Sequence, residues 1–386
     1  MARSHLKDFN MAAFWAGLTA FVWYAFGALP LHLEVAAALG LSRAESSSWI
    51  FIIWFASAVV TVGLSLFYRL PIPITWTIPG MIYLGTLAGQ FTFQEIVGAN
   101  LMAGIAIVVL GIFGFGERIM AWLPLPIVMG MFGGSILVYV TRMVAATVND
   151  VLVAGVTLAA YLAGRFINDP RVPPMANTSP DAISFALPQL AYPGMTFSPA
   201  AFIAVSFPMI ILAMGLGNVQ GLGFLLAQGY EVPVTRVTVL TGINSVVNAF
   251  LGGHASTVAR TGAAIVAGPE AGPKEGRYWA AVISALLTVT IALGAGTLTS
   301  LLAALPRTFV VTLAGLAIFS SLQGALETAF GGKLRFGALV ALAVAATSFK
   351  VFGITSGFWA LPAGIACSFL AERSDLLAYW RERRKK

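Results

Sequence analysis

The sequence predicts an all-α polytopic membrane protein, and three observations lead to this fold class. Hydrophobic residues make up 59% of the 386 residues and charged residues only 10%, whereas a soluble domain has roughly 45–50% and about 25%. Apolar runs recur along the chain, most of them near the ~20 residues that a helix needs to cross a bilayer. The net charge of +7 comes from basic residues in short loops and at the chain ends, which indicates membrane orientation rather than nucleic-acid binding.

The apolar runs divide into six before Pro199 and seven from Pro199 onward. Two of them, Ile72–Gly89 and His254–Gly268, open with irregular sequence and continue as a short helix. In chain order the runs are Met11–Leu39, Trp49–Phe67, Ile72–Gly89, Phe93–Phe115, Pro124–Ala145, Asp150–Phe166, Pro199–Ala227, Val237–Leu251, His254–Gly268, Tyr278–Ala304, Thr308–Phe330, Phe336–Phe349 and Phe352–Leu370.

The basic residues predict an even number of crossings. With a cytoplasmic N-terminus, fourteen crossings place 17 Lys and Arg residues inside and 4 outside, whereas thirteen place 8 inside and 13 outside. Because positive charge collects on the cytoplasmic side, we expect fourteen segments and both termini in the cytoplasm. The expected location is a bacterial-type inner membrane. The remaining crossing would lie between Arg171 and Ser198, where the sequence is a poor helix, so the seventh segment is expected to be shortened or irregular.

The two halves share a pattern that suggests a duplication. An odd number of segments in each half would make the repeats inverted; coincidence among apolar residues is the alternative. We expect a first repeat over residues 1–195, a second over 196–371 and a basic cytoplasmic tail over 372–386. The matching positions, 182 residues apart, are Leu123-Pro124 with Leu305-Pro306, Val128 with Val310 and Gly133 with Gly315; Trp76-Thr77 lies 178 residues before His254-Ala255.

The two irregular runs predict broken helices. Prolines at 71, 73 and 79 forbid a regular helix and favour an extended piece followed by a helix that starts near Pro79. In the second run Gly252 and Gly253 break the chain, and Ser256 or Thr257 is expected to cap the next helix. Non-helical backbone at membrane depth must be buried in protein or line a wet cavity. We therefore expect two half-helix N-termini near mid-bilayer, which suits an anionic substrate.

Several short motifs occur in a particular order. The first half contains Tyr68-Arg69-Leu70-Pro71 and then Trp76-Thr77-Ile78-Pro79-Gly80. The second half contains Gly217-Asn218-Val219-Gln220-Gly221, Gln228-Gly229-Tyr230, Phe250-Leu251-Gly252-Gly253-His254-Ala255 and Gly268-Pro269-Glu270-Ala271-Gly272-Pro273. In this order and spacing, over roughly residues 11–371, the chain resembles the benzoate–proton symporter family. It departs from the family pattern at Gln220, where proline is usual, and at Arg260, where a small apolar residue is usual.

The resemblance implies the fold shared with uracil/xanthine permeases and sulfate/anion transporters. That fold has fourteen segments in two inverted repeats of seven, with a short strand and a half-helix in segments 3 and 10. The implied activity is proton-coupled symport of benzoate or a similar aromatic carboxylate by alternating access, with sodium as the alternative coupling ion. The implied partners are the carboxylate and the bilayer, a homodimer is compatible with the resemblance, and nucleic acid is not expected.

The predicted substrate site gathers polar and aromatic side chains around the broken segments. His254 lies within a span, where ionisable groups are usually functional, and it could donate to a carboxylate or carry the coupling proton; packing against a carbonyl is the alternative. Glu327 is the second coupling candidate. The complete set of predicted site residues is Tyr24, Trp76, Thr77, Asn218, Gln220, His254, Ala255, Ser256 and Arg260.

Two roles stay open for several of these residues. Arg260 is either a bidentate anchor for a carboxylate or a structural cation that pairs with helix ends or with Glu327. Asn218 and Gln220 need a substrate or a cross-helix partner, because a buried unpaired amide costs a few kcal/mol. Gly217 and Gly221, nearby, are expected to allow close helix packing. His32 and Trp49 are interpreted as a segment end and an interfacial residue.

Other functions are less well supported by the sequence. A nucleobase permease would need a carboxylate in segment eight, and the stretch at Gly217-Asn218 holds none. An inorganic-anion transporter would suit Arg260. An enzyme is not expected, because no His, Cys and Asp group has metal-ligand spacing and Gly252-Gly253-His254 lacks the Lys-Ser/Thr of a phosphate loop. No metal or other cofactor is therefore predicted, and the single cysteine, Cys367, excludes a disulfide scaffold.

Overall fold

Helices dominate the computed structural model, which describes residues 5–114, 123–167, 186–304, 307–347, 349–352 and 354–383. Within these ranges six helical segments are long and apolar enough to cross a membrane. They are Met11–Ala38, Arg43–Tyr68, Phe93–Ile112, Leu125–Asn149, Pro199–Ala227 and Lys274–Leu293. The expected all-α polytopic fold is confirmed.

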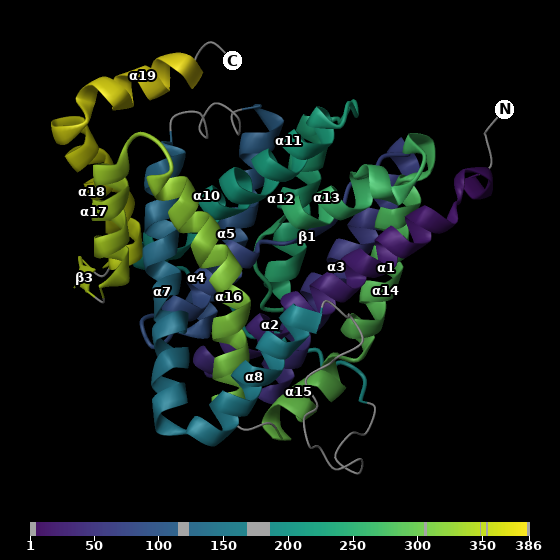
Figure 1. Ribbon diagram of the computed structural model, residues 1–386, viewed down its shortest axis with the longest axis horizontal. Helices are drawn as coiled ribbons and strands as arrows, with labels where there is room; N and C mark the ends of the chain where they lie inside the picture. Colours follow the sequence, from purple (N-terminus) through teal and green to yellow (C-terminus); the bar gives the residue numbers. More distant parts are fainter. Residues whose placement is uncertain are drawn as a thin grey trace.

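The elements alternate long helices with two strand-plus-half-helix units (Figure 1). In the first half they are η1 (His5–Asp8), α1 (Met11–Gly27), α2 (Leu29–Ala38), α3 (Arg43–Tyr68), β1 (Ile74–Trp76), α4 (Ile78–Thr86), α5 (Phe93–Ile112), α7 (Leu125–Asn149) and α8 (Val151–Ile167). In the second half they are α9 (Pro199–Ala201), η3 (Phe202–Ser206), α10 (Phe207–Ile211), η4 (Leu212–Asn218), α11 (Val219–Ala227), α12 (Val234–Phe250), β2 (Ser256–Val258), α13 (Arg260–Ala267), η5 (Pro269–Ala271), η6 (Lys274–Gly276), α14 (Tyr278–Leu293), α15 (Ala295–Ala304), α16 (Arg307–Phe330), α17 (Arg335–Ala346), β3 (Lys350–Val351), β4 (Ile354–Thr355), α18 (Ser356–Ala371) and α19 (Arg373–Arg383).

Equivalent elements of the two halves start 182 residues apart. The displacement relates β1 to β2, α4 to α13 and α7 to α16. The strands pair antiparallel, with Ile74 opposite Val258 and Trp76 opposite Ser256, as expected for inverted repeats. The strand-plus-half-helix units are confirmed, and their displacement equals that of the Leu-Pro motifs, so the 178-residue alignment of Trp76 with His254 is wrong by four residues.

The helices form two groups that meet along α2 and α4 (Figure 1). In one group α1 and α3 pack on α14, and α5 packs on α12, around the paired strands. In the other group α7 packs on α16 and α17, and α17 packs on α18. Gly130 and Gly134 of α7 face the backbone of α17, since small residues let membrane helices approach closely.

Both chain ends lie at the same end of the molecule in Figure 1, as an even number of crossings requires. Of the expected irregular seventh segment, residues 168–185 lie outside the described residues, and 186–198 contain no helix. This extended stretch crosses the starts of two helices: the Gln189 N–H donates to Oγ of Ser47 on α3, and the Thr196 N–H donates to the carbonyl of Gln94 on α5.

Candidate functional site

The two strands bring both half-helices to one place. The Thr77 N–H donates to the Ala255 carbonyl at 2.9 Å, and the Ala259 N–H donates to the Pro73 carbonyl at 2.9 Å. The half-helices α4 and α13 therefore begin at opposite ends of one short ribbon. The start of α4 is half-buried to buried, whereas Arg260 and Thr261 at the start of α13 are exposed, so only the first set of helix-start N–H groups lies in the protein interior.

The helix caps differ between the two units. Thr77 caps α4 through its hydroxyl, which accepts from the Gly80 N–H, and Pro79 occupies the first turn as expected. The expected Ser or Thr cap of α13 is wrong, because Ser256 and Thr257 belong to β2. Pairing with β1 delays the second helix until Arg260.

Side chains of neighbouring helices form hydrogen bonds with the N–H and C=O groups of the non-helical backbone, because such groups need partners when they are buried. The Thr61 hydroxyl on α3 accepts from the Ile74 N–H at 2.8 Å and donates to its carbonyl at 3.0 Å. The Ser245 hydroxyl on α12 accepts from the Ser256 N–H at 2.8 Å. The ribbon is thus fixed to one long helix on each side.

Beside the ribbon lies a buried group of rings, here called the histidine–tryptophan cluster: His32, Trp49, Trp54, Trp76 and His254. Each is at most 2% exposed. The His32 ring is the hub, with centroids 4.8 Å from Trp76, 5.9 Å from Trp54, 6.0 Å from Trp49 and 6.3 Å from His254. Three different parts of the first half and the loop before β2 meet in this cluster.

Several polar atoms of this cluster have no partner among the described residues. The Trp49 indole donates to Nδ1 of His254, and Nδ1 of His32 donates to the Ala28 carbonyl. The remaining ring nitrogens, Nε2 of both histidines and Nε1 of Trp54 and Trp76, are buried and unpaired. The Thr77 backbone lies close to the His254 ring, but no hydrogen bond of acceptable geometry joins it to Nε2. Because buried polar atoms are almost always hydrogen-bonded, this concentration makes the cluster the candidate ligand site.

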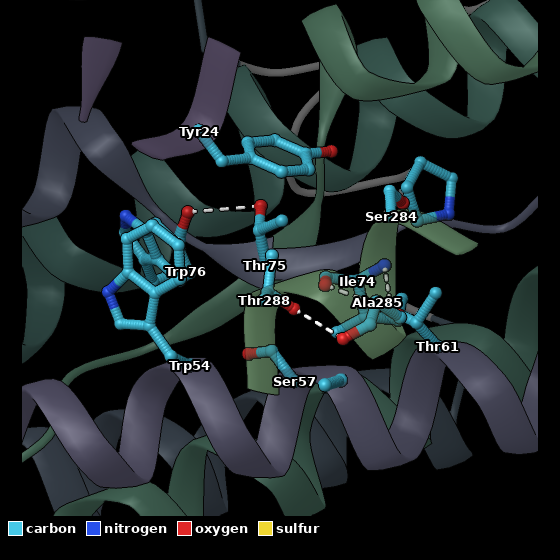
Figure 2. Close-up of a pocket in the computed structure, with 12 residues that line it drawn as sticks. Tyr24, Trp54, Ser57, Thr61, Ile74, Thr75, Trp76, Ser284, Ala285 and Thr288 are labelled. Carbon is cyan, nitrogen blue, oxygen red and sulfur yellow. Dashed lines mark hydrogen bonds between the residues drawn. The ribbon is translucent and has the colours of Figure 1, made fainter. Parts of the chain in front are cut away.

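A small pocket lies beside the Trp54 and Trp76 rings (Figure 2), and neither His32 nor His254 lines it. The two rings overlap in this view, with their indole nitrogens on the side away from Ser284. The pocket has about 10 Å³ of free volume, which is close to the space of one water molecule. An aromatic acid therefore enters only if the surrounding helices move. The polar lining residues are Tyr24, Ser57, Thr61, Thr75, Ser284 and Thr288.

The structure brings six of the predicted site residues together. Trp76 and Thr77 join His254, Ala255 and Ser256 through the strand pairing. Tyr24 approaches from α1, with its ring 6.3 Å from that of Trp76. Its hydroxyl is buried without a partner in the described chain and lies where a side chain on Gly262 of α13 would sit.

Asn218 makes hydrogen bonds to other parts of the protein. Its amide oxygen accepts from the Val258 N–H at 2.8 Å and from the Thr257 hydroxyl at 3.2 Å, and its amide nitrogen donates to the Thr241 hydroxyl at 3.0 Å. These bonds join η4, β2 and α12. Direct contact of Asn218 with substrate stays a prediction, and its geometry favours a structural role.

Three further candidates lie away from the cluster. Gln220 is half-buried on α11, and Arg260 is exposed at the start of α13. Glu327 is exposed on α16 and accepts a hydrogen bond from Gln323. The ion pairs found in the described part of the chain, Arg69–Asp8 and Lys333–Asp375, involve neither Arg260 nor Glu327. Gly217 packs on the Thr257 side chain of β2, so the close approach that it allows is to a strand rather than to the helix that the sequence suggested.

Sequence reasoning missed the hub of the cluster. His32 does not simply mark a segment end, because it is fully buried in the second turn of α2. Trp49 is not interfacial, because it is 1% exposed and bonded to His254. A histidine inside an apolar run was a usable signal for His32. No group of His, Cys, Asp and Glu suited to a metal ion occurs among the described residues.

Comparison with known families decides which kind of protein carries this site. The profile of the benzoate membrane transport protein family matches residues 7–178 and 175–370. The chain belongs to this family. The expected resemblance is confirmed, and the protein is an integral membrane transporter rather than an enzyme.

Two named relatives match most of the chain. The inner membrane protein YdcO of Escherichia coli K12 is 29% identical over 351 residues, covering 86% of this chain and 89% of its own. The benzoate membrane transport protein of Acinetobacter baylyi is 26% identical over 381 residues, covering 94% of this chain and 96% of its own.

Solved structures share the fold of this family member. The transmembrane domain of the cyanobacterial bicarbonate transporter BicA superposes with a TM-score of 0.54 at 15% identity, covering 92% of this chain and 97% of that one. Murine Slc26a9, an anion transporter in the inward-facing state, gives a TM-score of 0.53 at 13% identity, covering 96% and 69%. These likenesses establish the inverted-repeat fold.

Proposed function

We propose that this family member is a proton-coupled symporter of benzoate or a similar aromatic carboxylate, working by alternating access. The observation that carries the proposal is the histidine–tryptophan cluster, where unpaired ring nitrogens converge beside a half-helix start. The name of the Acinetobacter relative points to the same substrate. An inner-membrane location with cytoplasmic termini, and a homodimer, belong to this proposal.

The cluster has the chemistry that an aromatic carboxylate requires. Indole N–H groups are donors only, so Nε1 of Trp54 and of Trp76 suit carboxylate oxygens. The faces of the same rings offer apolar, polarisable surface for an aromatic ring. The start of α4 lies next to His254 through the Thr77–Ala255 hydrogen bond, and its dipole adds positive potential near the carboxylate.

Alternating access would use the boundary between the two helix groups. The helix α2, which carries His32, packs both on α4 of one group and on α16 of the other. Since the pocket near the cluster holds only about 10 Å³, this conformation would correspond to a closed form in such a cycle. Relative movement of the two groups would open the cluster to one side of the membrane at a time.

Transport by the purified protein in liposomes tests the proposal. Benzoate, uracil and sulfate should be offered with and without an imposed inward proton gradient, and with and without sodium. We expect benzoate to accumulate only with the proton gradient, and sodium to have no effect. Benzoate uptake that ignores the gradient would contradict proton coupling. Uptake of uracil or sulfate alone would favour a nucleobase or an inorganic anion as substrate instead.

A further inference from the structure

Two buried imidazoles from different halves of the protein lie close together. His32 comes from α2 and His254 from the loop before β2, with ring centroids 6.3 Å apart. We propose that Nε2 of His32 holds the coupling proton and shares it with the substrate carboxylate, while His254 only donates to that carboxylate. This inference rests on the proposed function and assigns the proton to one atom.

The hydrogen bonds of the two rings fix their tautomers. Because an indole N–H can only donate, Nδ1 of His254 accepts from Trp49 at 3.1 Å, and neutral His254 carries its proton on Nε2. Because a carbonyl can only accept, Nδ1 of His32 donates to Ala28 at 2.9 Å, and neutral His32 has a lone pair on Nε2. The unpaired nitrogens are therefore one donor and one acceptor.

This pairing does not suit a bare carboxylate. Nε2–H of His254 and the indole N–H groups of Trp54 and Trp76 can each donate to a carboxylate oxygen. The lone pair of His32 would repel that oxygen unless a proton lies between them. One oxygen with two hydrogen bonds of ~2.8–3.0 Å joins two nitrogen atoms that are up to about 6 Å apart. Two rings with centroids 6.3 Å apart allow such a span between their nitrogens. The site thus matches a carboxylate together with one proton.

The titratable groups near His32 come from its own helix and from the helices packed on it. The helices packed on α2 are α1, α3, α4 and α16. They contribute Tyr24 from α1, the non-titrating Trp49 and Trp54 from α3, and Tyr83 from α4, whose hydroxyl donates to the Ala204 carbonyl. Glu45 of α3 is half-buried and Glu327 of α16 is exposed. Glu34 lies two residues from His32, about 200° around the helix, and interacts with Tyr139 of α7.

Charge balance follows from this arrangement. A lone cation in the interior costs several kcal/mol, so His32 gains its proton together with an anion. One carboxylate and one proton enter from the same side, share the O···H···N bond in the closed form, and leave together on the other side. The complex carries no net charge beyond that of the empty site. Transport is therefore electroneutral, and carboxylate affinity falls as pH rises because binding takes up a proton.

Proton uptake on binding tests the assignment in the full-length purified protein. Benzoate is added in weakly buffered detergent solution at pH 7.5, and released or absorbed protons are measured with an indicator dye. Wild-type protein should absorb about one proton per bound benzoate, with affinity falling tenfold per pH unit. His32→Asn keeps an N–H for the Ala28 carbonyl but lacks Nε2. It should absorb no proton and bind benzoate at least tenfold more weakly, without pH dependence.

The other two histidines of the chain serve as matched controls. His254→Gln should bind more weakly yet still absorb one proton, and His5→Gln, at the N-terminal turn, should behave as wild type. Proton uptake retained in His32→Asn, or lost in His254→Gln, would overturn the assignment. Wild-type protein that binds no benzoate would instead contradict the proposed function.

A measurement on wild-type protein keeps the inference testable if His32→Asn and His32→Gln both fail to fold. Benzoate uptake into liposomes is followed at a fixed proton gradient while potassium and valinomycin impose a membrane potential. We expect the initial rate to stay the same when the inside is made negative. A rate that rises several-fold would show that more than one proton accompanies each carboxylate, and would overturn the shared-proton geometry.

Discussion

Trp49 donates its indole N–H to Nδ1 of His254 across 3.1 Å, joining two residues 205 positions apart in the chain. Both side chains are at most 1% exposed. The bond holds the neutral imidazole in the tautomer that carries its proton on Nε2. A helix of the first half therefore fixes the donor that a loop of the second half would offer to substrate in the proposed site.

Replacing Trp49 with Phe should weaken benzoate binding. The ring volume is largely kept, but the donor to His254 is lost, so the imidazole no longer has one fixed tautomer. A hydrogen bond of this kind contributes about 0.5–1.5 kcal/mol, which corresponds to a loss of roughly 3–10-fold in affinity. Isothermal titration calorimetry with benzoate measures the change.

The matched control is Trp15→Phe, since Trp15 is 57% exposed on α1. We expect its affinity for benzoate to equal that of wild type. Equal affinity in Trp49→Phe as well would mean that the tautomer of His254 has no influence on binding.

A second prediction concerns the contact of η4 with β2. A Cβ atom on Gly217 would lie 2.6 Å from Cβ of Thr257, so Gly217→Ala forces the strand or the helix to shift. Overpacking of this kind costs about 1–3 kcal/mol. Thermal unfolding in detergent should show a clear decrease in Tm. Gly223→Ala, on the neighbouring helix α11 with open space at its Cβ, should leave Tm unchanged or slightly raised.

Asn218 gives a third prediction that separates its two candidate roles. Asn218→Ala leaves the Val258 N–H and the Thr257 hydroxyl without this acceptor, which should lower the free energy of unfolding by about 1–3 kcal/mol. If Asn218 acts only through the protein, benzoate affinity measured well below the lowered Tm should fall by no more than a few-fold. A variant with wild-type Tm and strongly reduced affinity would make Asn218 a substrate contact.

The fourth prediction concerns Arg260. Its side chain is exposed, and exposed charges typically contribute about 0–1 kcal/mol, so Arg260→Ala should change benzoate affinity by less than about fivefold. His254→Ala, which removes a buried donor to a charged group, should lose tenfold or more. A larger loss in Arg260→Ala than in His254→Ala would make Arg260 the carboxylate anchor, as one of the two sequence interpretations holds.

Local sequence signals were sufficient to predict where the two broken segments lie. Prolines at 71, 73 and 79 and the glycines at 252 and 253 exclude a regular helix wherever the chain folds, because they act through the backbone of their own segment. For the same reason the position of α4 was predicted closely. The start of α13 was not, since Ser256 and Thr257 became strand residues only through pairing with β1.

Composition and the length of the apolar runs determined that this chain is a helical membrane protein, because a helix that crosses a bilayer needs about 20 mostly apolar residues. The repeated sequence pattern indicated that its helices form two related sets. The grouping of His32, Trp49 and His254 was decided only by the tertiary structure. His32, Trp49 and His254 are far apart in the chain, and each alone is compatible with packing or with a helix end. Antiparallel pairing of the two strands and the break after α1 bring their nitrogens together, and hydrogen bonding then makes one imidazole a donor and the other an acceptor.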